Sequence, residues 1–259
     1  MPTQDQIDDL IQTRGWVRFE GVLDPVRVAN LATDAEAIYA LRREVQVRNG
    51  VAGNMTGAAH HVLGQNTSLD RLVDEMPLME QIERYFDGKA ILLNFGATLH
   101  PPGTTTYTHR PHRDVRTWSN GFRLSLNMLV MLDDFTIENG APRLLEGSPR
   151  TEAMPSADVF AEQAIALTGK AGDIILFDSL VVHSAAPNGS SALRRGLTLC
   201  FGRPFMKPQM DWPRFLPVES HAGLTPTARQ LLGFHARVPS SVEDYYQPPE
   251  HWAFKADQI

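Results

Sequence analysis

The chain has 259 residues, of which 42% are hydrophobic and 21% are charged, and its formal net charge is -6. This composition supports a substantial apolar core and excludes an intrinsically disordered chain. The negative charge argues against nucleic-acid binding, no apolar stretch approaches the roughly 20 residues of a membrane helix, and the single Cys200 excludes an internal disulfide.

The N-terminal part of the chain shows a strand pattern followed by a helix pattern. The first ten residues, MPTQDQIDDL, are acidic and lack the basic start and apolar run of a secretory signal. Together with the single cysteine, they predict a cytoplasmic protein. The stretch GWVRFEGVL (15–23) alternates apolar and polar residues as a strand does. Residues 24–45 predict a helix, because Asp24 can cap it, Pro25 suits its first turn and apolar residues recur on one face.

A long segment without a clear pattern comes next. Residues 48–68 are rich in glycine and predict a loop, which fits a lid or binding loop and equally a mobile surface loop. Residues 68–86 predict a helix with a break near Pro77, since a proline inside a helix removes a backbone donor and clashes with the preceding turn.

From about residue 90 onward, short apolar segments alternate with turns that contain glycine and proline. The segments are KAILLNFGATL, FRLSLNMLVMLDDF, APRLLEG, AIALT, GDIILFDSLVVHSA and RRGLTLCFGRPF. Serial short strands predict a barrel or sandwich, such as a jelly roll, with the helices packed outside it. We expect one domain, 1–259, made of N-terminal helices (about 1–90), a β core (about 90–206) and a covering tail (207–259) with one short helix at 225–234.

The triplet His112-Arg113-Asp114 is the first candidate for a metal site. On an extended segment, residues i and i+2 share a face, so the imidazole and the carboxylate can bind one metal ion. His183 ends an apolar segment just before a Pro-Asn-Gly turn and can supply a third ligand. Two histidines and one carboxylate are the ligand set of non-haem Fe(II) oxygenases, although these residue types leave a catalytic zinc site open.

Arg194 favours iron over zinc. It lies on the next predicted strand, eleven residues after His183, and a buried guanidinium needs a carboxylate or phosphate partner. The distal carboxylate of 2-oxoglutarate is such a partner for a bidentate arginine. In the alternative interpretation, Arg194 and Arg195 flank a hairpin and face the solvent, and we expect this position for Arg195.

Several motifs, taken in their order along the chain, resemble one enzyme family. They are GWVRFEGVLDPVRVANL, HRD followed by Trp118, LDDFTIENGAPRLLEGSP, HSAAPNGSSALRRGLTL and ARQLLGF. Together they make the sequence similar to the phytanoyl-CoA dioxygenase family of Fe(II)- and 2-oxoglutarate-dependent oxygenases, which includes ectoine hydroxylase. The resemblance covers most of the chain.

The resemblance implies a mainly β fold with flanking helices, the double-stranded β-helix or jelly roll. It implies iron on His112, Asp114 and His183, and 2-oxoglutarate on Arg194. The implied reaction consumes O2 and 2-oxoglutarate, oxidises a small-molecule substrate and releases succinate and CO2. Halogenases of this superfamily lack the carboxylate ligand, so Asp114 favours hydroxylation or a related oxidation. A role in specialised metabolism is expected, and the substrate itself stays open.

The resemblance also suggests polar contacts to the co-substrate. Asn94, Thr98 and Asn127 lie on predicted strands from which they can reach 2-oxoglutarate, with ordinary strand hydrogen bonding as the alternative. Two places depart from the family pattern. The serine often found two residues after the distal histidine is Ala185 here, with Ser184 beside it, and the usual Pro-Gly-Ser-His turn is Glu146-Gly147-Ser148-Pro149. These departures put the co-substrate contacts other than Arg194 in doubt.

Three residues near the metal motif are candidates for the substrate pocket. Trp118, Arg116 and His109 flank the predicted ligands and can shelve or attract a substrate. A tryptophan packed in the core and an arginine paired with surface acids are equally good interpretations. Arg113, between two ligands that point inward, should face the opposite way.

Two other functions remain open on sequence alone. A different jelly-roll metalloenzyme, such as a cupin-like isomerase or a zinc hydrolase, would have no use for Arg194. A non-enzymatic binding module would have no use for the three metal ligands. We expect a small-molecule partner, no nucleic acid and no membrane, and the sequence does not indicate an oligomeric state.

Overall fold

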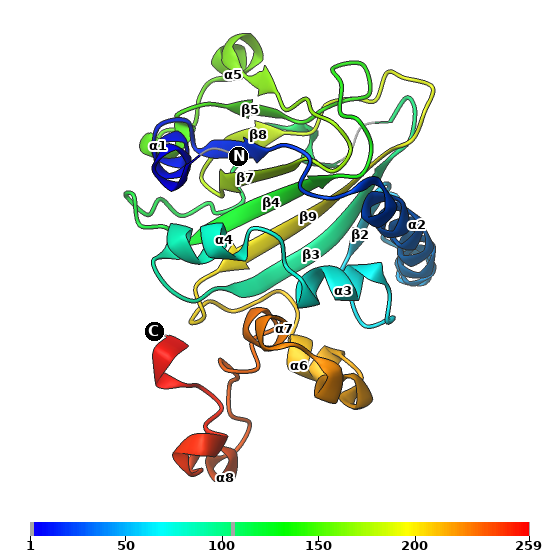
Figure 1. Cartoon of the computed structure of the whole chain (residues 1–259). Coiled ribbons are helices and arrows are strands. Elements are labelled where there is room, and N and C mark those ends of the chain that lie inside the picture. Colours follow the sequence, from blue (N-terminus) through cyan, green and yellow to red (C-terminus); the bar gives the residue numbers. More distant parts are fainter. Residues whose placement is uncertain (1–2, 105–106, 259) are drawn as a thin grey trace.

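The computed structural model describes residues 3–104 and 107–258, and it contains two antiparallel β-sheets with helices on the outside (Figure 1). The predicted domain limits Met1 and Ile259 lie outside the described residues. The strands are β1 (Trp16–Phe19), β2 (Ala58–His60), β3 (Ile91–His100), β4 (Ser125–Met131), β5 (Arg143–Leu145), β6 (Ile165–Ala166), β7 (Ile174–Asp178), β8 (Val182–Ser184) and β9 (Arg194–Gly202).

The helices are mostly short, with the exception of α2. The α-helices are α1 (Gln4–Arg14), α2 (Pro25–Arg48), α3 (Ser68–Asp74), α4 (Met79–Phe86), α5 (Ala157–Gln163), α6 (Trp212–Phe215), α7 (Pro226–Leu231) and α8 (Val242–Tyr245). The 3-10 helices are η1 (Tyr107–His109), η2 (Ser148–Arg150), η3 (Val218–Gly223), η4 (Pro249–His251) and η5 (Ala256–Gln258).

The strand order shows how the two sheets form a jelly roll. The larger sheet has the order β1-β7-β4-β9-β3-β2 and the smaller sheet the order β6-β5-β8. The apolar segment that ends in His183 divides between them, because β7 pairs in the larger sheet and β8 pairs with β5. A backbone bridge between His112 and His183 then joins the metal motif to β8. The predicted fold class is confirmed.

Two predicted helical regions form for the expected reasons. At the start of α2, the Asp24 carboxylate accepts hydrogen bonds from the backbone N–H groups of Val26 and Arg27, and Pro25 occupies the first turn. The expected break at Pro77 separates α3 from α4. Both helical regions lie on the outer face of the larger sheet (Figure 1).

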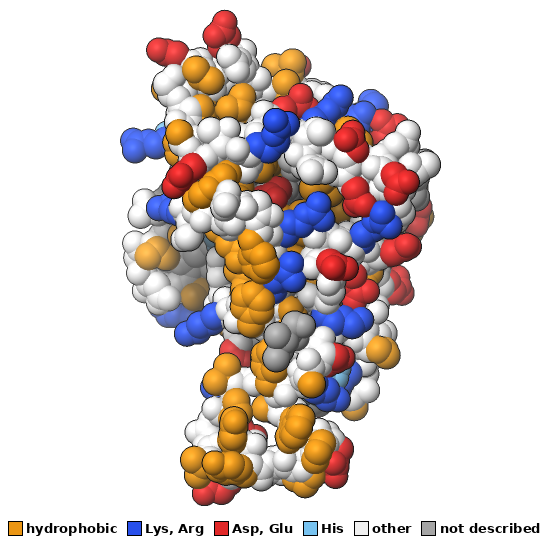
Figure 2. Space-filling view, turned by 90° about the vertical axis from the view of Figure 1, so that its left-hand side faces the viewer, with side chains coloured by type: hydrophobic (Ala, Val, Ile, Leu, Met, Phe, Trp, Pro, Cys, Tyr) orange, Lys and Arg blue, Asp and Glu red, His pale blue; other side chains and the backbone are white. Residues whose placement is uncertain are grey.

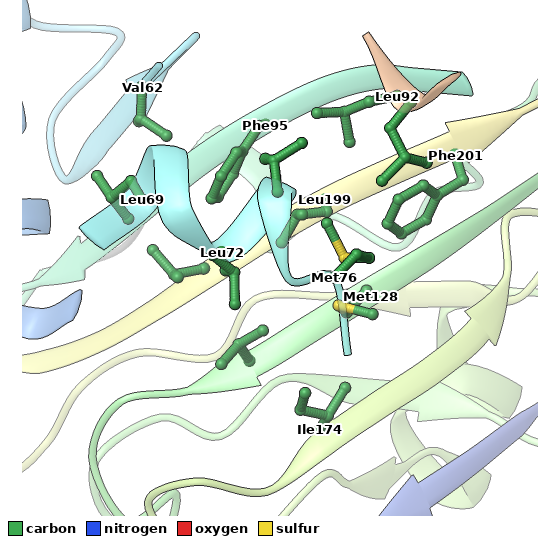
Figure 3. Packing of buried hydrophobic residues seen from close by; sticks show 14 of the residues in the cluster. Val62, Leu69, Leu72, Met76, Leu92, Phe95, Met128, Ile174, Leu199 and Phe201 are labelled. Atoms are coloured by element: carbon green, nitrogen blue, oxygen red, sulfur yellow. The ribbon is translucent and has the colours of Figure 1, made fainter. Parts of the chain in front are cut away.

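The main hydrophobic core lies between these helices and the larger sheet. Figure 3 shows Leu69 and Leu72 of α3 in one cluster with Phe95, Leu199 and Met128, which come from the neighbouring strands β3, β9 and β4. All five side chains are buried. Removal of apolar surface from water stabilises a fold by roughly 25 cal/mol per Å², so this face of the sheet is the main source of stability.

The segment 48–68 differs from its prediction as a loop. Helix α2 continues through Arg48, and Ala58–His60 form β2, which pairs antiparallel with β3. A strand of three residues leaves almost no periodic pattern, and its partner lies far along the chain. The N-terminal part is therefore not only helical, because β1 and β2 are the two edge strands of the larger sheet.

The C-terminal tail first packs against the body and then extends from it (Figure 1). Trp212 of α6 is buried and its indole Nε1 donates to the carbonyl oxygen of Leu92 at 2.8 Å. Helix α7, within the predicted helix 225–234, contacts α3 and β3. Around α8, exposed apolar side chains gather at the lower end of the molecule (Figure 2). Across the described ranges, no helix combines the length and apolar character needed to cross a membrane.

Candidate metal centre and co-substrate site

The inner face of the larger sheet carries a set of polar side chains. The strand register places Asn94, Cys200 and Asn127 side by side across β3, β9 and β4. Farther along the same face, His100 lies directly opposite Arg194. Side chains alternate between the two faces of a strand, so all five share one face. They line a cavity whose other wall comes partly from the smaller sheet.

His112, Asp114 and His183 come together in this cavity. One potential ligand atom from each lies within 4.8 Å of the other two. His112 Nε2 is 3.6 Å from Asp114 Oδ1, and His183 Nε2 is 3.7 Å from Asp114 Oδ2. The backbones of His112 and His183 exchange two hydrogen bonds, of 2.9 and 3.0 Å. The chain segments that carry the two imidazoles are therefore fastened to each other.

Backbone carbonyl groups set the orientation of both imidazoles. His112 Nδ1 is 2.8 Å from the carbonyl oxygen of Arg110, and His183 Nδ1 is 3.0 Å from that of Val181. A carbonyl oxygen can only accept, so each Nδ1 carries the hydrogen. In its neutral form, each imidazole then has a lone pair on Nε2 beside Asp114, which is the state that a metal ligand needs.

The charges in this cluster keep Asp114 ionised. Desolvation in the cavity raises the pKa of Asp114, but its interactions with the protonated forms of His112 and His183 outweigh this effect and hold that pKa below its usual value. Asn127 Nδ2 also donates to Asp114 Oδ2 at 2.7 Å. The interaction of its protonated form with Asp114 raises the pKa of His112, whereas burial lowers the pKa of His183.

The sequence predicted Asn127 as a contact of 2-oxoglutarate, whereas in the structure its side chain contacts a candidate metal ligand. It lies on β4, and its amide holds one carboxylate oxygen of a candidate metal ligand. Partners of this kind orient ligating carboxylates and commonly affect metal affinity.

Arg194 is buried in the same cavity, with 4% of its surface exposed. Its Nη1 donates to the carbonyl oxygen of Gly140 at 2.6 Å, and its Nη2 lies 2.7 Å from His100 Nδ1. The guanidinium carbon is 4.4 Å from the centroid of the Phe135 ring. The arginine is thus held by two hydrogen bonds and an aromatic face.

Gly140 occupies a position that only glycine fits. Its φ is +79°, and a Cβ atom built there would lie 2.6 Å from the carbonyl oxygens of Ala186 and Pro187. The Asn139-Gly140 turn of the sequence motif thereby brings a main-chain carbonyl to Arg194.

Arg195 points to the other side of β9 from Arg194. Its backbone N–H and its Nε both donate to Asp133 Oδ2, at 2.7 and 2.9 Å, and its Nη1 lies 2.8 Å from Glu36 Oε1. The expectation that Arg195 simply faces the solvent is thus incomplete, because the side chain is half-buried in an ion-pair network.

His100 is a residue of this site that the sequence interpretation missed. It is 1% exposed, lines the cavity and contacts Arg194. Burial lowers the pKa of His100 to about 4, and the charge of Arg194 acts in the same direction. The signal was present in the sequence: Asn94, Thr98 and His100 are separated by even numbers of residues on one strand, so they share a face.

The cavity has a volume of about 440 Å³ and contains other predicted co-substrate residues. Both Asn94 and Thr98 line it. Asn94 Oδ1 is buried and has no hydrogen-bond partner in the described part of the chain. Thr98 Oγ1 donates to the carbonyl oxygen of Gly196 at 3.3 Å. Ser184 and Ala185, next to His183, also line the cavity.

The three predicted substrate-pocket residues lie elsewhere. Neither Trp118, Arg116 nor His109 is among the residues that line the cavity. The Trp118 ring stacks with the guanidinium of Arg113 at 5.5 Å. Arg113 faces away from the metal ligands as expected, and it donates to the carbonyl oxygens of residues 148, 151 and 152. This outward direction is the physical reason why Trp118 does not line the cavity.

The residues present fit an iron ion and a dicarboxylate co-substrate. Two imidazole nitrogens with free lone pairs and one ionised carboxylate form a ligand set that leaves coordination positions open. Arg194 has no carboxylate within 4 Å among the described residues, so its buried charge lacks a counterion. A dianion that binds both the metal and Arg194 satisfies both groups.

Comparisons with known proteins agree with this geometry. The sequence matches the family described as phytanoyl-CoA dioxygenase over residues 11–196. An uncharacterised protein of Mycobacterium tuberculosis is 27% identical over 98% of this chain and 95% of its own length. The multifunctional dioxygenase ausE of Emericella nidulans is 25% identical over 90% of this chain and 84% of its own length.

A solved structure shares the fold. The iron-bound crystal structure of EctD from S. alaskensis superposes with a TM-score of 0.65 and 20% identity, and the match covers 80% of each chain. The family match spans the larger part of the sequence, including the three candidate ligands and Arg194. The chain belongs to the phytanoyl-CoA dioxygenase family of non-haem iron- and 2-oxoglutarate-dependent dioxygenases.

Proposed function

We propose that His112, Asp114 and His183 bind Fe(II), that Arg194 binds the distal carboxylate of 2-oxoglutarate, and that the chain hydroxylates a small molecule. The observation that carries this proposal is the presence of the three ligand atoms and an unneutralised buried guanidinium in one cavity. EctD supports it, because crystal structures of that protein contain iron and 2-oxoglutarate.

In this proposal, the residues of the chain position and shield the reactants. Bound iron and 2-oxoglutarate supply the oxidising chemistry. His112 and His183 present Nε2 lone pairs, while Asn127 fixes the carboxylate of Asp114. Arg194 holds one end of the co-substrate through charge-assisted hydrogen bonds. Substrate oxidation of this kind does not need a protein side chain as a base.

The cavity walls support a mainly apolar substrate. Leu93, Leu129 and Met206 line it together with small residues of β2. Lys207 adds a positive charge to the lining, and no acidic partner of its side chain lies within 4 Å in the described residues. We therefore propose an apolar small molecule that carries an anionic substituent.

The expected domain organisation is part of the same proposal. Strands β1 and β2 from the N-terminal part complete the larger sheet, which supports one domain over residues 1–259. The cytoplasmic location and the role in specialised metabolism stay predictions.

An anaerobic spectroscopic experiment tests the metal assignment. The protein with Fe(II) and 2-oxoglutarate should show the weak visible charge-transfer band of an iron-bound 2-oxo acid. His112→Ala should remove that band, because one ligand is lost. His109→Ala is the matched control, since His109 lies three residues away and does not line the cavity, and it should keep the band. An unchanged band in His112→Ala would refute the iron assignment.

A further inference from the structure

We propose that His100 is a positioning residue which fixes the Arg194 guanidinium without neutralising its charge, and so reserves that charge for the distal carboxylate of 2-oxoglutarate. This inference rests on the proposed co-substrate role of Arg194. It goes beyond that role, because it assigns a function to His100, whose described side-chain hydrogen bond is to Arg194 and not to a metal ligand.

The geometry gives Arg194 two anchors, and neither carries a charge. His100 and Arg194 are paired residues on the neighbouring strands β3 and β9, and the side chains meet at 2.7 Å between Nδ1 and Nη2. The second anchor is the carbonyl oxygen of Gly140, 2.6 Å from Nη1. Together they restrict rotation of the guanidinium and leave its positive charge intact.

Chemistry settles the protonation state of His100. A guanidinium has only hydrogen-bond donors, so Nδ1 of His100 must accept and cannot carry a hydrogen. The imidazole is therefore neutral, with its hydrogen on Nε2. Burial and the charge of Arg194 both lower the pKa of this residue. Nε2 has no hydrogen-bond partner within 3.5 Å among the described residues, although the carbonyl of Thr104 is near enough to affect the pKa.

Arg195 shows the alternative arrangement, in which the protein itself supplies carboxylates to the guanidinium. Arg195 is neutralised by Asp133 and Glu36, and these contacts raise its pKa. Its neighbour Arg194 is more deeply buried, and burial lowers its pKa to about 10 although the charge of Asp133 acts in the opposite direction. No carboxylate lies within 4 Å of the Arg194 guanidinium among the described residues. Two adjacent arginines on one strand thus differ in burial and in whether the protein supplies a carboxylate in contact with the guanidinium.

A carboxylate at position 100 would remove this difference. It would reach the same guanidinium nitrogen and would compete with any bound dicarboxylate. A neutral acceptor at position 100 orients Arg194 equally well and leaves the anion site empty for the co-substrate. The choice of histidine over an acid therefore decides whether Arg194 can bind an external carboxylate.

The test compares His100→Gln with His100→Glu, which are nearly equal in size and differ in charge. Binding of 2-oxoglutarate to the anaerobic Fe(II) protein is measured by isothermal titration calorimetry, and thermal unfolding is measured without 2-oxoglutarate. We expect His100→Glu to bind 2-oxoglutarate at least about 10-fold more weakly than His100→Gln, which corresponds to the weaker end of measured close charge-pair couplings. We also expect His100→Glu to melt at a higher temperature than His100→Gln, because Glu supplies the missing counterion.

The two readouts move in opposite directions, which a general packing defect cannot produce. Equal affinity of the Gln and Glu variants, or a lower melting temperature for Glu than for Gln, would overturn the inference. The pair His100→Asn and His100→Asp repeats the comparison with shorter side chains if the longer pair does not fold.

Arg194→Met separates this inference from the proposed function. If Arg194→Met binds 2-oxoglutarate as tightly as the wild type, the co-substrate role of Arg194 is wrong. If Arg194→Met loses affinity while the His100 variants bind equally, the co-substrate role stands and the inference about His100 fails.

Discussion

The two faces of the larger sheet are made by the same strands and serve opposite purposes. On the outer face, Phe95, Leu199 and Met128 are buried beneath helices (Figure 3). On the inner face, the alternate positions of these strands carry asparagine, threonine, histidine, arginine and cysteine. Buried polar atoms without partners occur there, including Asn94 Oδ1 and Arg194 Nε. The comparison indicates that one face stabilises the fold and the other gives up stability in order to bind ligands.

The largest expected effect on stability comes from a substitution on the outer face. Phe95→Ala should lower the free energy of unfolding by about 3–5 kcal/mol, because it leaves a cavity in a closely packed core. Phe95 is fully buried. Asn94→Ala, one residue away on the inner face, is the matched control and should change stability by less than about 1 kcal/mol, since it removes an unsatisfied carbonyl oxygen. Urea unfolding measures both, and equal losses would contradict the division between the faces.

A second prediction concerns acid and the inner face. The pKa of His100 is about 4 in the folded chain and 6.5 in the reference state, so the unfolded chain binds a proton more readily. The folded state favours the neutral form, and the resulting stability contribution is full above pH 6.5 and is lost as the pH falls toward 4. The loss is about 3 kcal/mol.

His100→Gln should not show this term, because glutamine does not titrate. Denaturant unfolding of the metal-free protein at pH 7, 5.5 and 4 should therefore show the wild type losing stability relative to His100→Gln by that amount. A constant difference between the two proteins over this pH range would contradict the assignment of a neutral, buried imidazole.

The smallest of these effects concerns the metal centre. Asn127→Ala removes the amide that donates to Asp114 Oδ2 at 2.7 Å, and it should weaken Fe(II) binding roughly 10- to 100-fold. Ser125→Ala is the control, because Ser125 lies on the same strand and the same face but its hydroxyl makes no hydrogen bond to Asp114 in the described part of the chain. Anaerobic Fe(II) titration measures both. Similar affinities for the two variants would show that Asn127 does not orient the ligand.

Periodic patterns predicted the elements that depend on local sequence. The helix at 24–45 and the break at Pro77 follow from capping and proline chemistry, and the structure has both. The three-residue strand β2 was missed, because its existence depends on pairing with β3 and not on its own residues. Helix α5 was also missed, although Ser156 caps it and is a local signal that the interpretation did not use.

The site was predictable to a similar degree. The spacing of two residues between His112 and Asp114 indicated a shared metal, and the geometry is compatible with that hypothesis. The position of Trp118 was not predictable from its sequence separation from His112. Trp118 stacks on Arg113, which points away from the cavity. His100 needed knowledge of the strand register, since only the pairing of β3 with β9 places it opposite Arg194.

Main-chain carbonyls orient His112 and His183, and this has a consequence for which substitutions the protein can accept. The carbonyls belong to Arg110 and Val181, yet every amino acid has such a group, so the identity of those two residues is free with respect to the aim of the ligands. At the exposed position 110, charge and bulk can therefore vary without turning the His112 ring, whereas Val181 is fully buried in the core. A binding site built in this way can acquire new substrates through its surroundings while the reactive centre keeps its geometry.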